Sequence, residues 1–170
     1  MFDIRNALPQ MPDTARIWMF GAHRKMTAQE VQSLSSEMSI FVSGWQAHGK
    51  DLVADFVILL DAVLVVAVDE SKEPPSGCSI DKVFQLLKLQ QEKNQLDFFQ
   101  RTLIWSVIHN DLRIDTPETI ALALQSGDVD FNTPVINMLS PNLGGLRSHG
   151  LVTLSQSWIA KKLQRELNIS

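Results

Sequence analysis

The spacing of apolar residues in the first part of the chain predicts a strand, a helix and a hairpin. An aromatic and β-branched run at 16–20 is typical of a strand. Over residues 28–47 apolar side chains recur at steps of three and four, which predicts a helix with one apolar face. Two apolar runs, 52–60 and 62–68, meet at Asp61 and therefore predict an antiparallel hairpin.

The remainder of the chain continues this alternation of helices and strands. Cys78 or Ser79 is expected to cap a second helix that ends near Asn94. A threonine cap followed by Pro117 marks the start of a third helix. The elements expected after the second helix are strands at 101–108, 135–139 and 151–154, a helix at 117–126, a flexible loop at 141–150 and a closing helix from Ser157.

The order of these elements predicts the fold. Residues 16–109 run strand, helix, strand, strand, helix, strand, which is the pattern of ferredoxin-like folds. We therefore expect an α+β protein in one domain, 1–170, with a ferredoxin-like βαββαβ two-layer core at about 16–109 and a small β/α extension at 110–170. The runs 57–60 and 64–67 are apolar on both faces, so the extension or a second subunit must cover the second face of the sheet.

Composition and charge exclude several classes of function. The 170 residues include 15 Lys and Arg against 19 Asp and Glu, a net charge of −4, which argues against nucleic-acid binding. The single cysteine, Cys78, cannot form an internal disulfide, and residues 1–5 lack the features of a signal peptide, so a cytoplasmic location is expected. Asp55 and Asp61 interrupt the apolar stretch 52–68, which argues against a membrane span.

In a ferredoxin-like topology three polar segments are expected at one edge of the sheet: 48–50, 69–79 and 109–111. From these segments come two candidate catalytic residues, Cys78 and His48. The candidate ligand-binding residues are Asp69, Glu70, Ser79, His109 and Asp111.

Cys78 is the sharpest chemical candidate, because the positive end of a helix dipole favours a reactive thiolate. His48 could act as its base, with Asp69 or Glu70 orienting the imidazole. Simpler interpretations stay open: Cys78 as a small buried core residue, His48 as a cation at a helix C-terminus, and Ser79 as a cap.

A metal site is a further alternative at the same edge. His109 and Asp111 would complete a mixed site with His48 and Cys78. However, the sequence contains no close ligand spacing such as Cys-x-x-Cys or His-x-x-x-His. We therefore expect neither a metal nor a cofactor.

Several short segments occur together in one known family. They are Arg16-Ile17-Trp18, Gln46-Ala47-His48-Gly49, Val68-Asp69-Glu70-Ser71, Ser76-Gly77-Cys78-Ser79-Ile80-Asp81 and Ser157-Trp158. On these segments, and over most of its length, the chain resembles a small bacterial family of unknown function often labelled "ABC transporter ATPase". The resemblance implies no established activity, substrate or cofactor.

The label can be tested against the sequence. An ABC ATPase needs a Gly-x-x-x-x-Gly-Lys-Ser/Thr loop between a strand and a helix to hold nucleotide phosphates. The chain contains no such motif: Gly144-Gly145 lacks the lysine and the hydroxyl, and 44–50 lacks the second glycine in register. We therefore do not expect ATPase chemistry.

The function expected from the sequence is that of a ligand- or partner-binding module, with a protein or a small molecule as its partner. The first alternative is a thiol-dependent enzyme that uses Cys78 with His48. The second is a structural homo-oligomer that buries the apolar sheet face between subunits. A monomer and a homodimer are both compatible with the sequence, and neither a nucleic-acid nor a membrane partner is expected.

Overall fold

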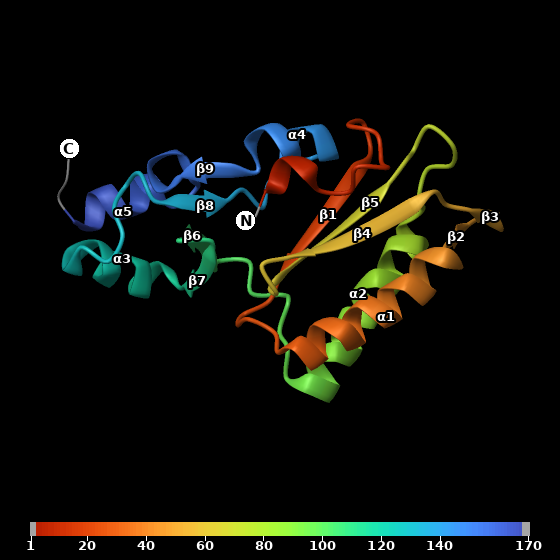
Figure 1. The fold of residues 1–170 in the computed structure, drawn as a ribbon, viewed down its shortest axis with the longest axis horizontal. Helices are drawn as coiled ribbons and strands as arrows, with labels where there is room; N and C mark the ends of the chain where they lie inside the picture. The colour runs from red at the N-terminus through yellow and green to blue at the C-terminus, as the bar shows by residue number, and fades with distance from the viewer. Residues whose placement is uncertain (1–2, 168–170) are drawn as a thin grey trace.

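The computed structural model describes residues 3–167 and shows an α+β protein with antiparallel sheets. Two sheets lie next to each other along the long axis of the molecule (Figure 1). The first comes from the first half of the chain and is here called the N-terminal sheet. The second comes from residues 104–153 and is called the C-terminal sheet.

The N-terminal sheet has the strand order β1-β5-β4, with both pairs antiparallel. Two helices, α1 and α2, lie on one of its faces (Figure 1). The central strand β5 is buried at every residue, as its uninterrupted apolar sequence predicts. The bounds are β1 Arg16–Gly21, α1 Ala28–Ser43, β4 Ala54–Leu59, β5 Val63–Val68 and α2 Gly77–Asn94.

Local sequence signals account for most of these elements. Thr27 and Glu30 form the expected capping box at the start of α1. The β4–β5 turn places Leu60 and Asp61 at positive φ, 49° and 56°, as the two central residues of a type I′ turn require, and the Ala62 N–H closes the turn by donating to the Leu59 carbonyl at 3.1 Å. Helix α1 ends at Ser43, four residues earlier than expected.

After α1 the chain enters a small hairpin, β2 (Gln46–Ala47) and β3 (Lys50–Asp51), with Trp45 buried just before it. Helix α2 begins two or three residues earlier than expected from the sequence. Its cap is Ser76, whose hydroxyl accepts a hydrogen bond from the Ser79 N–H, so neither Cys78 nor Ser79 is the cap.

The second face of the N-terminal sheet is covered by the chain itself. The short helices η1 (Ile4–Asn6) and α4 (Leu143–His149) lie on the side of the sheet opposite α1 and α2 (Figure 1). Buried residues of both, among them Ile4, Leu143 and Leu146, belong to the same hydrophobic core as β5. Covering this face therefore requires no second subunit.

The C-terminal sheet has the order β7-β6-β8-β9 and its own small core. That core joins the sheet to α3 and α5 through buried residues such as Ile120, Val135 and Leu163. The bounds are β6 Ile104–Ile108, β7 Asp111–Asp115, α3 Pro117–Ser126, β8 Pro134–Ile136, β9 Leu151–Thr153, η2 Leu154–Gln156 and α5 Ala160–Glu166.

The complete ferredoxin-like sheet expected from the sequence is not confirmed, because β6 does not pair with β1. The following strand β7 gives β6 a partner along its whole length. The outer edge of β1 is bonded instead by the segment before α4. The Ile17 N–H donates to the Pro141 carbonyl at 3.5 Å, and the Leu143 N–H donates to the Ala15 carbonyl at 2.9 Å.

The segment expected to be a flexible loop, 141–150, contains α4. Asn142 caps this helix by accepting a hydrogen bond from the Gly145 N–H at 2.8 Å, and Leu143 and Leu146 anchor it in the core. Two glycines in its first turn had suggested a loop.

Among residues 3–167, no helix has the length and apolar character needed to cross a membrane.

Candidate functional site

Two of the three polar segments expected at one edge do meet there. The β2–β3 hairpin, which carries His48, contacts the loop after β5 through an ion pair between Lys50 Nζ and Glu73 Oε2 at 2.9 Å. It also contacts the start of α2, where the Trp45 indole N–H donates to the Ser79 carbonyl at 2.8 Å. We call this region the hairpin edge.

The two candidate catalytic residues are both exposed at the hairpin edge. Cys78 is the second residue of α2 and is an exposed free thiol, so it is not the buried core residue of the simpler interpretation. His48 lies in the hairpin turn at φ 52°, and therefore not in a helix. No hydrogen bond joins the two side chains in the part of the chain that the structure describes.

The other polar groups at the hairpin edge have partners within the protein. Hydrogen bonds from the Ser71 side chain and backbone lower the pKa of Asp69 below its ordinary value. Glu70 pairs with Arg16 at 3.2 Å. Ser79 is buried, and its hydroxyl donates to the Ser76 carbonyl at 2.7 Å, so it stabilises the start of α2.

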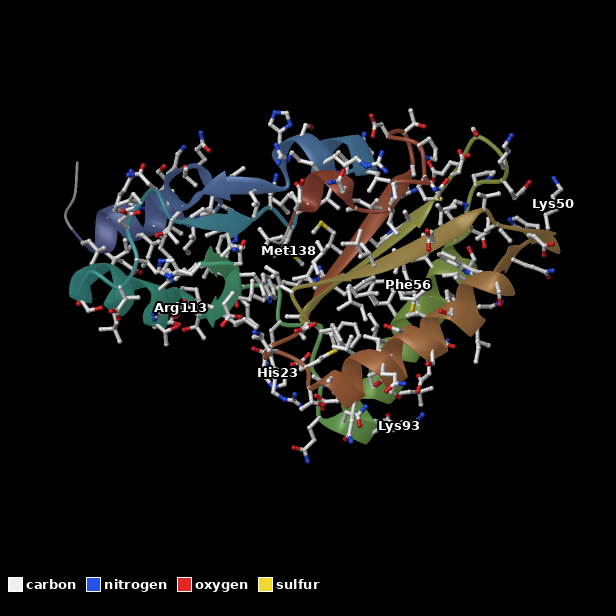
Figure 2. All side chains as sticks on the ribbon, viewed as in Figure 1. His23, Lys50, Phe56, Lys93, Arg113 and Met138 are labelled. Atoms are coloured by element: carbon white, nitrogen blue, oxygen red, sulfur yellow. The ribbon has the colours of Figure 1, made fainter. Side chains whose placement is uncertain are left out.

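His109 and Asp111 do not reach the hairpin edge. They belong to the β6–β7 hairpin, and Asp111 pairs with Lys25, which follows the far end of β1. This hydrogen bond from Lys25 lowers the pKa of Asp111. Figure 2 shows Lys50 of the hairpin edge and His23 near Lys25 at opposite ends of the N-terminal sheet. The reason is that β6 leaves that sheet. Within residues 3–167 no group of three His, Cys, Asp or Glu residues could hold a metal ion.

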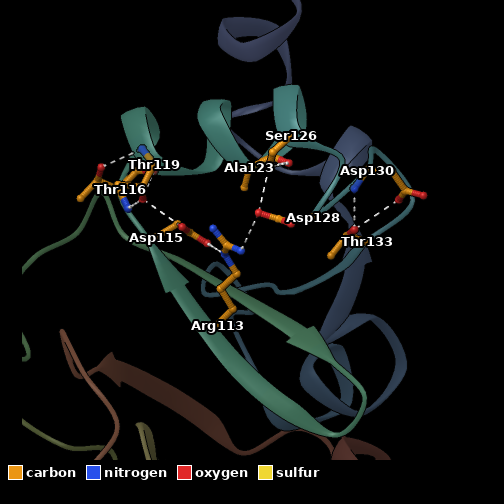
Figure 3. A network of polar contacts seen from close by, with 9 residues as sticks. All are labelled: Arg113, Asp115, Thr116, Thr119, Ala123, Ser126, Asp128, Asp130 and Thr133. Atoms are coloured by element: carbon orange, nitrogen blue, oxygen red, sulfur yellow. Dashed lines mark hydrogen bonds and ion pairs between the residues drawn. The ribbon is translucent and has the colours of Figure 1, made fainter.

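A polar cluster that the sequence analysis did not single out joins β7 to α3 (Figure 3). Arg113 Nε lies 2.8 Å from Asp115 Oδ2, and the Thr119 hydroxyl donates to Asp115 Oδ1 at 2.9 Å. The Asp115 side chain is only 4% exposed, and Asp128 lies 3.9 Å from Arg113 on the outer side. Because Arg113 pairs with the buried carboxylate of Asp115, which also accepts a hydrogen bond from Thr119, the cluster stabilises the packing of β7 against α3.

A hollow lies at the junction of the two sheets, along the outer edge of β1. We call it the aromatic cleft. It has a volume of about 270 Å³, and Met138, on its wall, lies between the sheets in Figure 2. Its lining residues are Trp18 to Gly21, Phe84, Phe98 to Arg101, Trp105, Met138 and Leu139.

The walls of the aromatic cleft are held by contacts between aromatic rings. Phe84 of α2 meets Phe20 edge to face at a centroid distance of 5.3 Å and stacks on Phe99 at 6.1 Å. The Trp105 indole N–H donates to the Ala22 carbonyl at 3.0 Å. The rim is more open, since the Leu139 side chain is 74% exposed.

One wall of the cleft is the bare edge of a strand. The Ile17 N–H points away from β5, toward Pro141, so the backbone groups of Met19 and Gly21 point to the same side. Farther along, the His23 N–H donates to the Asp97 carbonyl at 2.9 Å. Between these two bonds, no residue from 3 to 167 supplies a hydrogen-bond partner for the outward groups of Met19 and Gly21.

Comparison with known proteins assigns neither a family nor a function to this chain. No protein-family model matches the chain, and neither the curated proteins nor the solved structures contain a significant match. The functional interpretation therefore depends on the geometry itself.

Proposed function

We propose that this protein is a binding module that holds an apolar ligand in the aromatic cleft. The observation that carries the proposal is a pre-formed hollow of about 270 Å³ whose aromatic walls meet unpaired backbone donors and acceptors. Its volume is close to the lower limit of roughly 300 Å³ for ligand pockets, which are mostly apolar with a few polar groups that set orientation.

The fold gives a reason for this hollow. We propose that the N-terminal sheet with α1 and α2 is a ferredoxin-like unit without its fourth strand. The order β1-β5-β4 and the helices on one face support this view. The position beside β1 that β6 would occupy is then only partly filled, and the aromatic cleft lies there.

The hairpin edge is a weaker candidate for the binding site. Its acidic groups Asp69, Glu70 and Glu73 are engaged by neighbouring groups of the same chain. Cys78 and His48 share no hydrogen bond among the described residues, which leaves thiol catalysis without a geometric argument.

Binding of the uncharged dye Nile red tests the proposal. The dye gains fluorescence in apolar surroundings, so the wild-type protein should give a saturable increase with one site per chain. Leu139→Gln removes an apolar group from the rim and should raise the Kd about tenfold, which corresponds to about 1.4 kcal/mol. The measurement is a fluorescence titration at constant protein concentration.

Leu122→Gln is the matched control, because Leu122 is 63% exposed on α3 and does not line the cleft. Its Kd should equal that of the wild type. Absence of saturable binding to the wild type, or an equal effect of both substitutions, would contradict the proposal.

A further inference from the structure

We infer that the ligand of the aromatic cleft is a short extended apolar peptide, which adds to the outer edge of β1 as a further strand. This inference rests on the proposed function and specifies its ligand class. Two features that lie together support it: the outer edge of β1 has unpaired backbone groups, and this edge lies inside the aromatic cleft.

The hydrogen-bonding groups of the edge match an extended backbone. Met19 and Gly21 each direct one N–H and one C=O into the cleft, and residues two apart in a strand are separated by about 6.6 Å. An added strand presents its own donors and acceptors at the same interval. Main-chain hydrogen bonds would then supply affinity without requiring a particular side chain.

The walls define the side chains that such a peptide should carry. Successive residues of a strand point to opposite faces of the sheet. Phe84 of α2 lines the cleft on the side of the helices, and Met138 and Leu139, in the turn after β8, line it from the second half of the chain. Both sets of peptide side chains therefore meet apolar surface, so we expect consecutive apolar residues with little polar alternation.

A charge at the mouth refines this expectation. Arg101 lines the cleft, is exposed, and has no ion-pair partner among residues 3–167. A carboxylate on the peptide, from an acidic residue or a free C-terminus, complements this guanidinium. The expected ligand is thus an apolar stretch flanked by a carboxylate.

The shape of the cleft favours a single strand over a second copy of the protein. Residues 98–101 and 138–139 line the cleft along the open part of the edge, and the Pro141–Leu143 segment occupies its beginning. Pairing of β1 with the β1 strand of a second copy would need a longer exposed edge. The second copy carries a neighbouring strand and two helices beside its own β1, and these would need room as well.

Phage display of random seven-residue peptides against the wild-type protein identifies the ligand sequence, with Nile red displacement as the readout of cleft binding. We expect enriched apolar peptides with one acidic group. Each selected peptide is then synthesised with a single N-methyl group at successive positions. Methylation at alternate residues should raise the Kd at least tenfold, and methylation at the intervening residues should leave it within about threefold, since only alternate N–H groups face β1.

Met19→Pro provides a test from the side of the protein. Proline removes the outward N–H, and an edge strand accepts it because that N–H is not part of the β5 pairing. The variant should lose peptide binding at least tenfold while still binding Nile red. Met19→Ala, which keeps the N–H but shortens a side chain that lines the cleft, separates the two effects: its Kd for the peptide should rise less than that of Met19→Pro. The N-methyl series needs no variant and remains decisive if Met19→Pro does not fold.

The outcomes separate the two proposals. Nile red binding without any enriched peptide, or N-methyl effects without alternation, overturns the peptide inference and leaves the binding module standing. Failure of the wild-type protein to bind Nile red overturns both. A concentration-dependent dimer in light scattering that Met19→Pro abolishes assigns the edge to a second copy and likewise overturns the peptide inference.

Discussion

The indole ring of Trp105 lies against Gly21, so closely that a β-carbon at position 21 would come within 2.1 Å of the ring. The indole N–H also donates to the carbonyl of the next residue, Ala22. Since Trp105 belongs to β6 and Gly21 ends β1, this contact fixes the two sheets against each other and forms part of the wall of the aromatic cleft.

Gly21→Ala is therefore expected to destabilise the protein by about 3 kcal/mol, because the rigid ring must move to admit the methyl group. Urea unfolding followed by circular dichroism measures the change. Gly77→Ala is the matched control: a β-carbon there has no neighbour within 4 Å, and it should be neutral or slightly stabilising. In a Trp105→Leu background the cost of Gly21→Ala should fall, and an undiminished cost would contradict this explanation.

Asp115→Asn should destabilise the protein by about 3 kcal/mol, at the lower end of the range for a broken buried ion pair. The carboxylate that faces Arg113 is lost, while the 35% exposure of the Arg113 side chain limits the penalty. Thermal unfolding of the single variants and of the Asp115→Asn, Arg113→Met double variant gives the coupling energy. Additive effects of the two substitutions would show that the ion pair contributes no coupling.

Arg147→Lys should destabilise the region around η1. The guanidinium donates to the carbonyls of Ala7, Leu8 and Met11 at 3.1, 2.6 and 3.0 Å, and a single ammonium cannot reproduce these bonds. We expect a loss of about 3 kcal/mol in urea unfolding. Arg165→Lys, at an exposed position of α5, should change stability by less than about 0.5 kcal/mol. Equal losses in both variants would refute the role of Arg147.

Glu30 is expected to make the stability of the fold depend on pH in the acid range. Its hydrogen bonds from Arg24 and from the Thr27 backbone lower its pKa from 4.5 to about 2. The ionised form therefore stabilises the folded state fully above pH 4.5, and this contribution is lost as the pH falls toward 2. Glu30→Gln should cost about 1–2 kcal/mol at pH 7.

The difference between the wild type and Glu30→Gln should shrink when unfolding is repeated from pH 5 to pH 2. Glu92→Gln, on the exposed side of α2, serves as the control and should match the wild type throughout. A cost for Glu30→Gln that stays constant down to pH 2 would contradict the assigned role of Arg24.

Cys78 should react completely with iodoacetamide in the folded protein, because its thiol is exposed. Mass spectrometry follows the reaction, and protection until denaturant is added would contradict the exposed position. The rate also tests the thiol-enzyme hypothesis, which requires it to fall in His48→Ala. If the protein is a binding module alone, the rate in His48→Ala should equal that in His109→Ala, because His109 lies in the β6–β7 turn, away from the hairpin edge.

Elements with strong local signals could be predicted from the sequence, and pairings between distant segments could not. The capping box of Thr27 and Glu30 and the Thr116–Pro117 start define α1 and α3 within the chain that forms them. The apolar sequence of β6 is compatible with pairing to β1 or to later strands, and in the structure β7 and β8 pair with its two edges. Only the completed packing decides between these partners, so the sequence predicts the α+β class but does not determine which strands β6 joins.

The same limit applies to the candidate site. The order of the elements correctly predicted that the segment of His48 lies near the start of α2, because elements that are close in the sequence form the hairpin edge. The aromatic cleft was missed since its walls come from β1, α2, the 98–101 segment and residues 138–139. Trp18 and Trp105 are spaced like ordinary core residues. The unpaired groups beside them belong to the backbone, and the amino-acid sequence does not show which backbone groups are unpaired.

The bonds of Arg147 join segments that are 140 residues apart in the sequence. During synthesis, residues 7–11 leave the ribosome long before their guanidinium partner exists. Until α4 follows, one apolar face of the N-terminal sheet lacks the part of its cover that Leu143 and Leu146 supply, although the helices α1 and α2 and the β4–β5 hairpin are already available. The nascent chain thus passes through a stage at which apolar surface is exposed, the condition that favours aggregation, and the synthesis of α4 ends that stage.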